Sequence, residues 1–110
     1  MRYNQLGNSG LFVSELCLGT MTFGSAKWGT PEHEAKQMYG RFRDLGGNYL
    51  DTANEIYAEG RSEEIVGGLI ADHRHEIVVA TKYSFAMPGG LLTDQQRNLM
   101  SFAGQKRCQL

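Results

Sequence analysis

The apolar residues of this chain fall into blocks whose spacing changes from strand-like to helix-like and back. Near the start, residues 2–6 and 11–16 are short semi-apolar stretches separated by Gly7-Asn8-Ser9-Gly10. These glycines allow the positive backbone angles of a tight reversal, so the pattern predicts a β-hairpin. Its second arm continues as an apolar run over 13–18, which predicts a strand closed by Gly19-Thr20.

A helical pattern follows the first strand. Thr30-Pro31-Glu32 is typical of a helix start, because Thr can cap free amides, Pro presets the backbone angle, and Glu favours the positive end of the helix dipole. Gly46-Gly47 permits a left-handed helix end. Between these signals, apolar residues at spacings of three and four predict one buried stripe, made of Ala35, Met38, Phe42 and Leu45.

The same alternation then repeats. Residues 48–51 predict a short strand, and Ser62-Glu63-Glu64 predicts a second capped helix that runs to about His73. Its apolar stripe is formed by Ile65, Leu69 and Ile70. Residues 76–82 are rich in β-branched side chains without alternation, which is typical of a buried parallel strand.

The order strand, helix, strand, helix, strand predicts an α/β fold with a parallel sheet, which can close as a barrel or remain open and doubly wound. The open dinucleotide-binding version needs a GxGxxG sequence after the first strand, and none is present there, so a barrel is favoured. Beyond residue 90 we find no further strand pattern, and 91–110 is expected to be a divergent, poorly ordered tail.

The amino-acid composition excludes several functional classes of protein. With 110 residues, 41% apolar residues and a formal charge of -1, the chain suits one soluble domain or part of one, and it lacks the basic surplus of a nucleic-acid-binding protein. Neither a membrane span nor a signal peptide is visible, so we expect a cytoplasmic protein. Cys17 and Cys108 have no metal-like spacing, and His73-Arg74-His75 lacks further ligands, so no metal site is predicted.

Polar residues lie just past the apolar runs, where a parallel barrel holds its chemistry. They are Gly19-Thr20, Asp51 and Lys82, with Tyr57 nearby. Asp51 and Lys82 end neighbouring strands, so we expect the carboxylate and the ammonium to pair. Without further evidence such a pair would be an incidental salt bridge, worth about 0–1 kcal/mol when exposed.

The same residues have a chemical interpretation. A phenol has a pKa of about 10, and a nearby ammonium favours the phenolate, so Lys82 would make Tyr57 a better acid while Asp51 holds Lys82 in place. A positioned acid contributes roughly 10² to 10⁴ in rate when a carbonyl gains a proton, and the hydride must come from a cofactor. The backbone at Gly19-Thr20-Met21 would let a nicotinamide approach closely.

Five segments resemble the aldo-keto reductases, namely residues 6–14, 18–24, 51–53, 60–64 and 80–82. The resemblance covers about residues 1–90 and implies the N-terminal part of a (β/α)8 TIM barrel, with the hairpin as the plug at its bottom. It also implies NADPH (NADP) as cofactor and a small-molecule carbonyl substrate.

In that family a tetrad of Asp, Tyr, Lys and His acts on the carbonyl, and the resemblance assigns the first three roles to Asp51, Tyr57 and Lys82. Gly19, Thr20, Met21 and Asp51 carry over as cofactor contacts. The family His follows a fourth strand and has no counterpart here. The segment from Asp51 to Tyr57 is also one residue longer than the common family pattern.

A second hypothesis stays open beside the enzyme. Only three of the eight strands of a complete barrel are predicted here, which favours a catalytically incomplete product of truncation, frameshift or splicing. The other form of this hypothesis is a non-catalytic binding protein like the reductase-related β subunits of potassium channels. A barrel of this type needs about 250 residues, so we expect the isolated chain of 110 residues to show little or no turnover.

Overall fold

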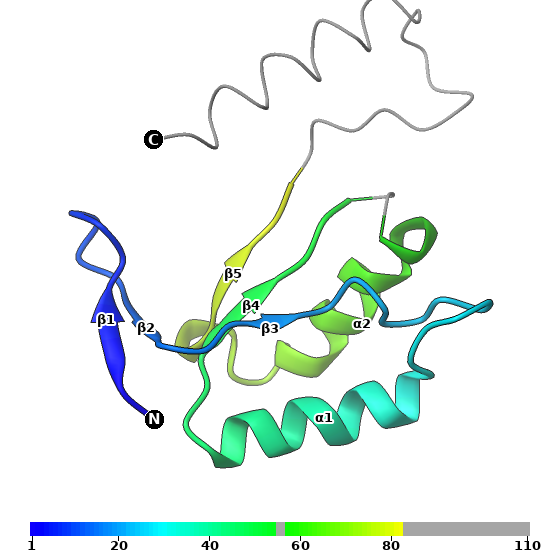
Figure 1. The fold of residues 1–110 in the computed structure, drawn as a ribbon, viewed down its shortest axis with the longest axis horizontal. Helices are drawn as coiled ribbons and strands as arrows, with labels where there is room; N and C mark the ends of the chain where they lie inside the picture. The colour runs from blue at the N-terminus through cyan, green and yellow to red at the C-terminus, as the bar shows by residue number, and fades with distance from the viewer. Residues whose placement is uncertain (55–56, 83–110) are drawn as a thin grey trace, which may run out of the picture.

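A computed structural model describes residues 1–54 and 57–82 of the chain. It begins with a two-stranded antiparallel hairpin of β1 (Tyr3–Gln5) and β2 (Phe12–Ser14), in which Asn4 pairs with Val13. The predicted hairpin is therefore confirmed. In Figure 1 it stands beside a separate parallel sheet. The predicted tail at 91–110 lies outside the described residues.

The single strand predicted over 13–18 is wrong, because the structure divides it between two sheets. β2 ends at Ser14, and β3 (Leu18–Gly19) begins four residues later in the parallel sheet. Ser14 fixes the bend: its amide donates to Asn48 Oδ1 at 2.7 Å, and its hydroxyl donates to the Leu16 carbonyl at 2.7 Å. Cys17, between the strands, is exposed.

The parallel sheet has the order β3-β4-β5, with β4 at Tyr49–Asp51 and β5 at Val78–Ala80. Gly19 is in register with Asp51, and Asp51 with Ala80. The predicted α/β class and parallel order are confirmed. β5 is shorter than the predicted strand over 76–82, because a 3-10 turn, η2 (Arg74–Glu76), occupies the residues before it.

The first helix, α1, spans Glu32–Asp44 and ends before Gly46, whose φ of +90° confirms the predicted stop. The predicted cap is wrong, since Thr30 pairs with Thr22 instead of capping the helix, and no side chain caps it. The predicted stripe is wrong at Met38 and Leu45, which are exposed. The helix buries Ala35 and, in place of Met38, Tyr39.

The second helix, α2, spans Arg61–Ile70 and follows a short 3-10 turn, η1 (Ala58–Gly60). Its N-cap is Gly60, with φ +88°, and it has no side-chain cap. The predicted cap at Ser62 is therefore wrong, because Ser62 lies inside the first turn and is fully buried. The helix ends at Ile70, three residues before the predicted end.

One hydrophobic core lies between the two helices and one face of the sheet (Figure 1). Leu50 is fully buried there, and Leu18 and Val79 pack against it from the neighbouring strands. Because side chains alternate along a strand, the Asp51 side chain points to the opposite face, which carries no helix among the described residues, and Gly19 is in register beside it. In that part of the chain, no helix is long and apolar enough to cross a membrane.

Candidate active site

An ion pair lies at the C-terminal end of the parallel sheet. Asp51 is the last residue of β4, and Lys82 follows β5 by two residues, so the parallel register brings both to the same edge. Lys82 Nζ donates to Asp51 Oδ1 at 2.7 Å and to Oδ2 at 2.8 Å. The pairing expected from the sequence is confirmed.

A third hydrogen bond completes the donor set of the ammonium, since Lys82 Nζ also donates to the Thr52 carbonyl at 3.0 Å. Burial alone lowers the pKa of Lys82, but the hydrogen bond and negative charge of Asp51, with a smaller contribution from Tyr57, outweigh it. The net pKa lies above its ordinary value. The side chains of Lys82 and Asp51 remain 41% and 36% exposed, so the pair faces solvent.

Tyr57 lies beside the ion pair. Lys82 Nζ is 5.1 Å from the centroid of the Tyr57 ring, within the range of a cation–π contact. The Tyr57 amide donates to the Asn54 carbonyl at 3.0 Å. The longer segment between Asp51 and Tyr57 thus still brings the phenol to the ammonium.

Three consecutive residues at the end of β3 differ in their exposure near the ion pair, namely Gly19, Thr20 and Met21. A Cβ built on Gly19 meets nothing within 4 Å, so the backbone opposite Asp51 is open to an approaching molecule. Met21 is exposed, but Thr20 is fully buried. The Thr20 hydroxyl donates to the Asp51 carbonyl at 3.0 Å, so this side chain is turned away from solvent.

Sequence reasoning missed a buried cluster beneath the ion pair. The hydroxyls of Thr20 and Ser62 lie 2.8 Å apart, those of Thr52 and Ser62 lie 2.9 Å apart, and the Ser62 hydroxyl also donates to the Thr20 carbonyl at 2.8 Å. The signal available in the sequence was a hydroxyl residue directly after each of two strands and a Ser in the first turn of α2.

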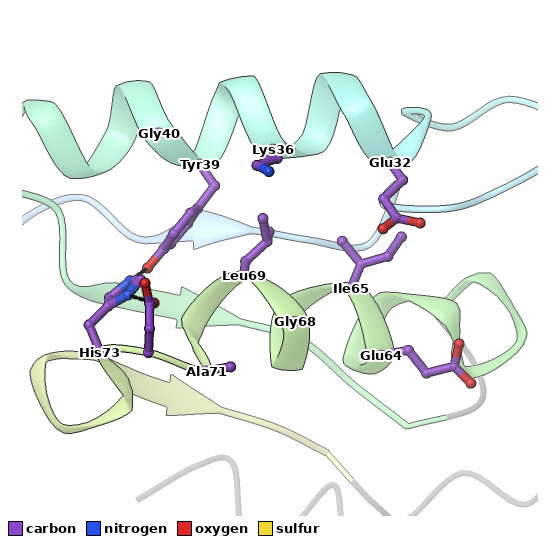
Figure 2. A pocket seen from close by; sticks show the side chains of 11 residues that line it. Glu32, Lys36, Tyr39, Gly40, Glu64, Ile65, Gly68, Leu69, Ala71 and His73 are labelled. Atoms are coloured by element: carbon purple, nitrogen blue, oxygen red, sulfur yellow. Dashed lines mark hydrogen bonds and ion pairs between the residues drawn. The ribbon is translucent and has the colours of Figure 1, made fainter.

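The histidines lie elsewhere. The Tyr39 hydroxyl is 2.5 Å from His73 Nε2, and Asp72 contacts the other ring nitrogen, Nδ1. Figure 2 shows Tyr39 and His73 meeting across a groove of about 550 Å³ between α1 and α2. None of the residues lining this groove belongs to the ion pair, and His73 follows α2.

Residues 15–106 match the model of the aldo/keto reductase family. The chain belongs to the aldo/keto reductase family. This confirms the resemblance that the five sequence segments carry. The chain is 45% identical over 82 residues to the oxidoreductase YqkF of Bacillus subtilis, covering 74% of this chain and 25% of that protein.

Two further similarities extend this finding. The chain is 43% identical over 93 residues to a "Probable voltage-gated potassium channel subunit beta" of Arabidopsis thaliana, covering 81% of this chain and 27% of that protein. A thermostable aldo-keto reductase solved with the inhibitor epalrestat superimposes with a TM-score of 0.63 at 29% identity, covering 76% of this chain and 31% of that one. The chain thus spans about a quarter of the length of these curated relatives.

Proposed function

We propose that this chain supplies the first βα units of an aldo-keto reductase (β/α)8 barrel and carries three groups of a reaction that reduces aldehydes or ketones to alcohols. The observation that carries the proposal is the ion pair of Lys82 and Asp51 with the Tyr57 ring 5.1 Å from the ammonium. Family membership supports the same reaction class.

Each of the three side chains has a distinct role. Tyr57 donates its phenolic proton to the carbonyl oxygen of the substrate, and the ammonium of Lys82 stabilises the phenolate that remains. Asp51 holds the ammonium with both carboxylate oxygens, so the charge stays at the ring. NADPH, when bound, supplies the hydride that the carbonyl carbon accepts.

The described residues fit one wall of a nicotinamide site. The open backbone at Gly19 lies opposite Asp51, on the sheet face that carries no helix among the described residues, and the absence of a Cβ leaves room for a flat ring to approach the backbone there. Met21 is exposed beside it. We propose Gly19, Met21 and Asp51 as the contacts on this wall, with Thr20 acting through the Asp51 backbone.

The first test measures NADPH oxidation by the isolated chain with a generic aldehyde. We expect little or no turnover, because β3 and β5 each pair on one side only among the described residues and the side chains of Lys82 and Asp51 are partly exposed to water. Robust oxidation would overturn the proposal that this chain is inactive alone.

The second test asks whether these residues support catalysis in a complete barrel. Residues 1–82 replace the matching segment of a full-length family member with measured aldehyde reductase activity. We expect NADPH-dependent turnover that Tyr57→Phe reduces by roughly 10² to 10⁴. Tyr3→Phe, which removes an exposed phenol from β1 of the hairpin, is the control. A folded chimera whose turnover does not depend on Tyr57 would contradict the proposal.

The alternative function is a catalytically incomplete or purely binding protein. The observation that favours it is the similarity to a relative named as a potassium channel β subunit. In that case the chimera would bind NADPH, seen as a change in its fluorescence, without consuming it.

A further inference from the structure

The hydroxyl cluster of Thr20, Thr52 and Ser62 joins three elements at one buried point. Thr20 follows β3, Thr52 follows β4, and Ser62 lies in the first turn of α2. Their exposed fractions are 0%, 2% and 0%, so water does not supply their hydrogen bonds. Ser62 is the centre, because its Oγ lies within 2.9 Å of both threonine hydroxyls.

Each hydroxyl proton of the cluster has an acceptor. A hydroxyl has one proton to donate and two lone pairs that accept. In one assignment that uses every proton, Thr52 donates to Ser62, Ser62 donates to the Thr20 carbonyl, and Thr20 donates to the Asp51 carbonyl. Among the described residues, Ser62 then links the Thr52 hydroxyl to the Thr20 backbone. Its loss leaves the buried Thr52 hydroxyl without its acceptor, whereas the Thr20 carbonyl keeps the hydrogen bond from the Phe23 amide.

Hydrogen bonds connect this cluster to the backbone of Asp51 and to the ammonium of Lys82. Thr20 bonds to the carbonyl of Asp51, so it fixes the backbone from which the carboxylate extends. Thr52 is held by Ser62 through its hydroxyl and accepts Lys82 Nζ at its carbonyl. The Ser62 amide also lies 3.5 Å from the Tyr57 carbonyl.

We propose that Ser62 is a positioning residue that sets the geometry of the ion pair between Asp51 and Lys82. It acts through Thr20 on one side and Thr52 on the other, and it touches neither charged group itself. Its consequence for carbonyl reduction rests on the proposed function. The geometric role does not, because the ion pair exists in the chain by itself.

A purely structural role would be that the cluster only anchors α2 to the sheet. The two roles differ in what happens to the ammonium. If Ser62 only anchors the helix, its loss lowers stability in the same way as any buried truncation in α2. If Ser62 positions the pair, its loss also loosens the hydrogen bonds of Lys82 and lowers the pKa of that amine toward its ordinary value.

The experiment uses the full 110-residue chain without cofactor. The pKa of Lys82 is measured by NMR titration of its ε-carbon in the wild type, in Ser62→Ala and in Thr52→Val, which keeps the shape of Thr52 but removes its hydroxyl. Val66→Ala is the matched control, because Val66 is buried one turn further along α2 and belongs to the apolar core.

We expect Ser62→Ala and Thr52→Val to lower the pKa of Lys82, and Val66→Ala to leave it at the wild-type value. The double variant should lower it no further than the stronger single variant, because both changes break the same hydrogen bond. Equal values in Ser62→Ala, Thr52→Val and Val66→Ala would overturn the proposal. If Ser62→Ala does not fold, Thr52→Val against Val66→Ala decides by the same criterion.

This readout separates the two proposals. A lowered pKa of Lys82 together with a chimera whose turnover ignores Tyr57 would refute the proposed function and leave the positioning role standing. An unchanged pKa together with Tyr57-dependent turnover would do the reverse.

Discussion

At the scale of single residues, the charge of Lys82 makes stability depend on pH. Its pKa is raised, because the hydrogen bond and charge of Asp51 outweigh the opposing effect of burial. A raised pKa on a basic group means that the folded state binds the proton more tightly than the unfolded chain does. The stabilisation is therefore fully present below the ordinary pKa of 10.5 and is lost as pH rises through the folded value above it.

The raised pKa of Lys82 predicts how the stability of a Lys82 variant depends on pH. Lys82→Met removes the stabilisation, so the wild type should be more stable than the variant at neutral pH, by no more than about 1 kcal/mol because the pair is partly exposed. The difference should shrink above pH 10.5. Urea unfolding of both proteins across this range measures it, with Lys27→Met as an exposed control. A difference that grew with pH would contradict the assignment.

The second prediction concerns Gly24. Its φ is +81°, and a Cβ there would lie 2.8 Å from the buried Ile65 Cδ1 and 2.9 Å from Arg61 Cβ. Gly24→Ala should therefore combine backbone strain with a clash against α2 and destabilise the fold by about 2–4 kcal/mol. Gly10→Ala is the matched control, because Gly10 has a φ of +76° and nothing within 4 Å, so it costs only the strain. Equal unfolding free energies for the two variants would rule out the clash.

At the scale of elements, a polar contact joins α1 to the segment that follows α2, at one end of the core that the two helices share. His73 Nδ1 contacts the Asp72 carboxylate, and Nε2 on the other side of the ring lies 2.5 Å from the Tyr39 hydroxyl. Burial raises the pKa of Tyr39. The charge of Arg43 opposes this shift and the charges of Asp72 and Glu76 add to it, so the net effect favours the neutral phenol.

Tyr39→Phe should break this connection and destabilise the fold by about 1 kcal/mol, the usual net worth of one hydrogen bond. The control is Tyr3→Phe, whose hydroxyl bonds the Gly46 carbonyl at 2.6 Å from a residue that is 49% exposed. Water replaces that bond, so its loss should cost less. Chemical denaturation measures both variants, and a larger loss for Tyr3→Phe would show that the contact at His73 contributes little.

The sequence predicts the elements better than their contacts. Glycines at the reversals and β-branched runs determine local backbone conformation, so the hairpin, both helices and the parallel order follow from them. The pairing of Asp51 with Lys82 is also predictable, because parallel strands bring their C-terminal ends to one edge.

Contacts set by tertiary structure are not predictable in this way. Ser62 has the local pattern of an N-cap, but its hydroxyl bonds to Thr20, 42 residues away in the chain. The buried face of α1 is likewise set by its tertiary contacts. Met38 and Tyr39 are adjacent, so which of the two is buried depends on what the helix packs against. His73 forms a hydrogen bond with the Tyr39 hydroxyl, and Met38 has no group that could make this bond.

At the scale of the whole molecule, the described residues leave a large part of the sheet uncovered. One face packs on α1 and α2, and the other carries Asp51 and Lys82 without a covering layer in the described part of the chain. β3 and β5 are edge strands there. Large apolar side chains are also exposed in the hairpin and in the segment leading to β3, among them Leu6, Leu11, Phe12 and Leu16.

Open edges and exposed apolar side chains promote association between copies. We therefore expect the isolated chain to associate as its concentration rises, and Phe12→Lys combined with Leu16→Lys to weaken that association. Trp28→Lys is the matched control, because Trp28 is 64% exposed but lies in the loop between β3 and α1. Sedimentation velocity over a range of concentrations measures the effect. A monomer at every concentration would show that these surfaces do not meet, whereas an equal effect of all the lysine substitutions would indicate a general role of charge instead of a specific role of the hairpin.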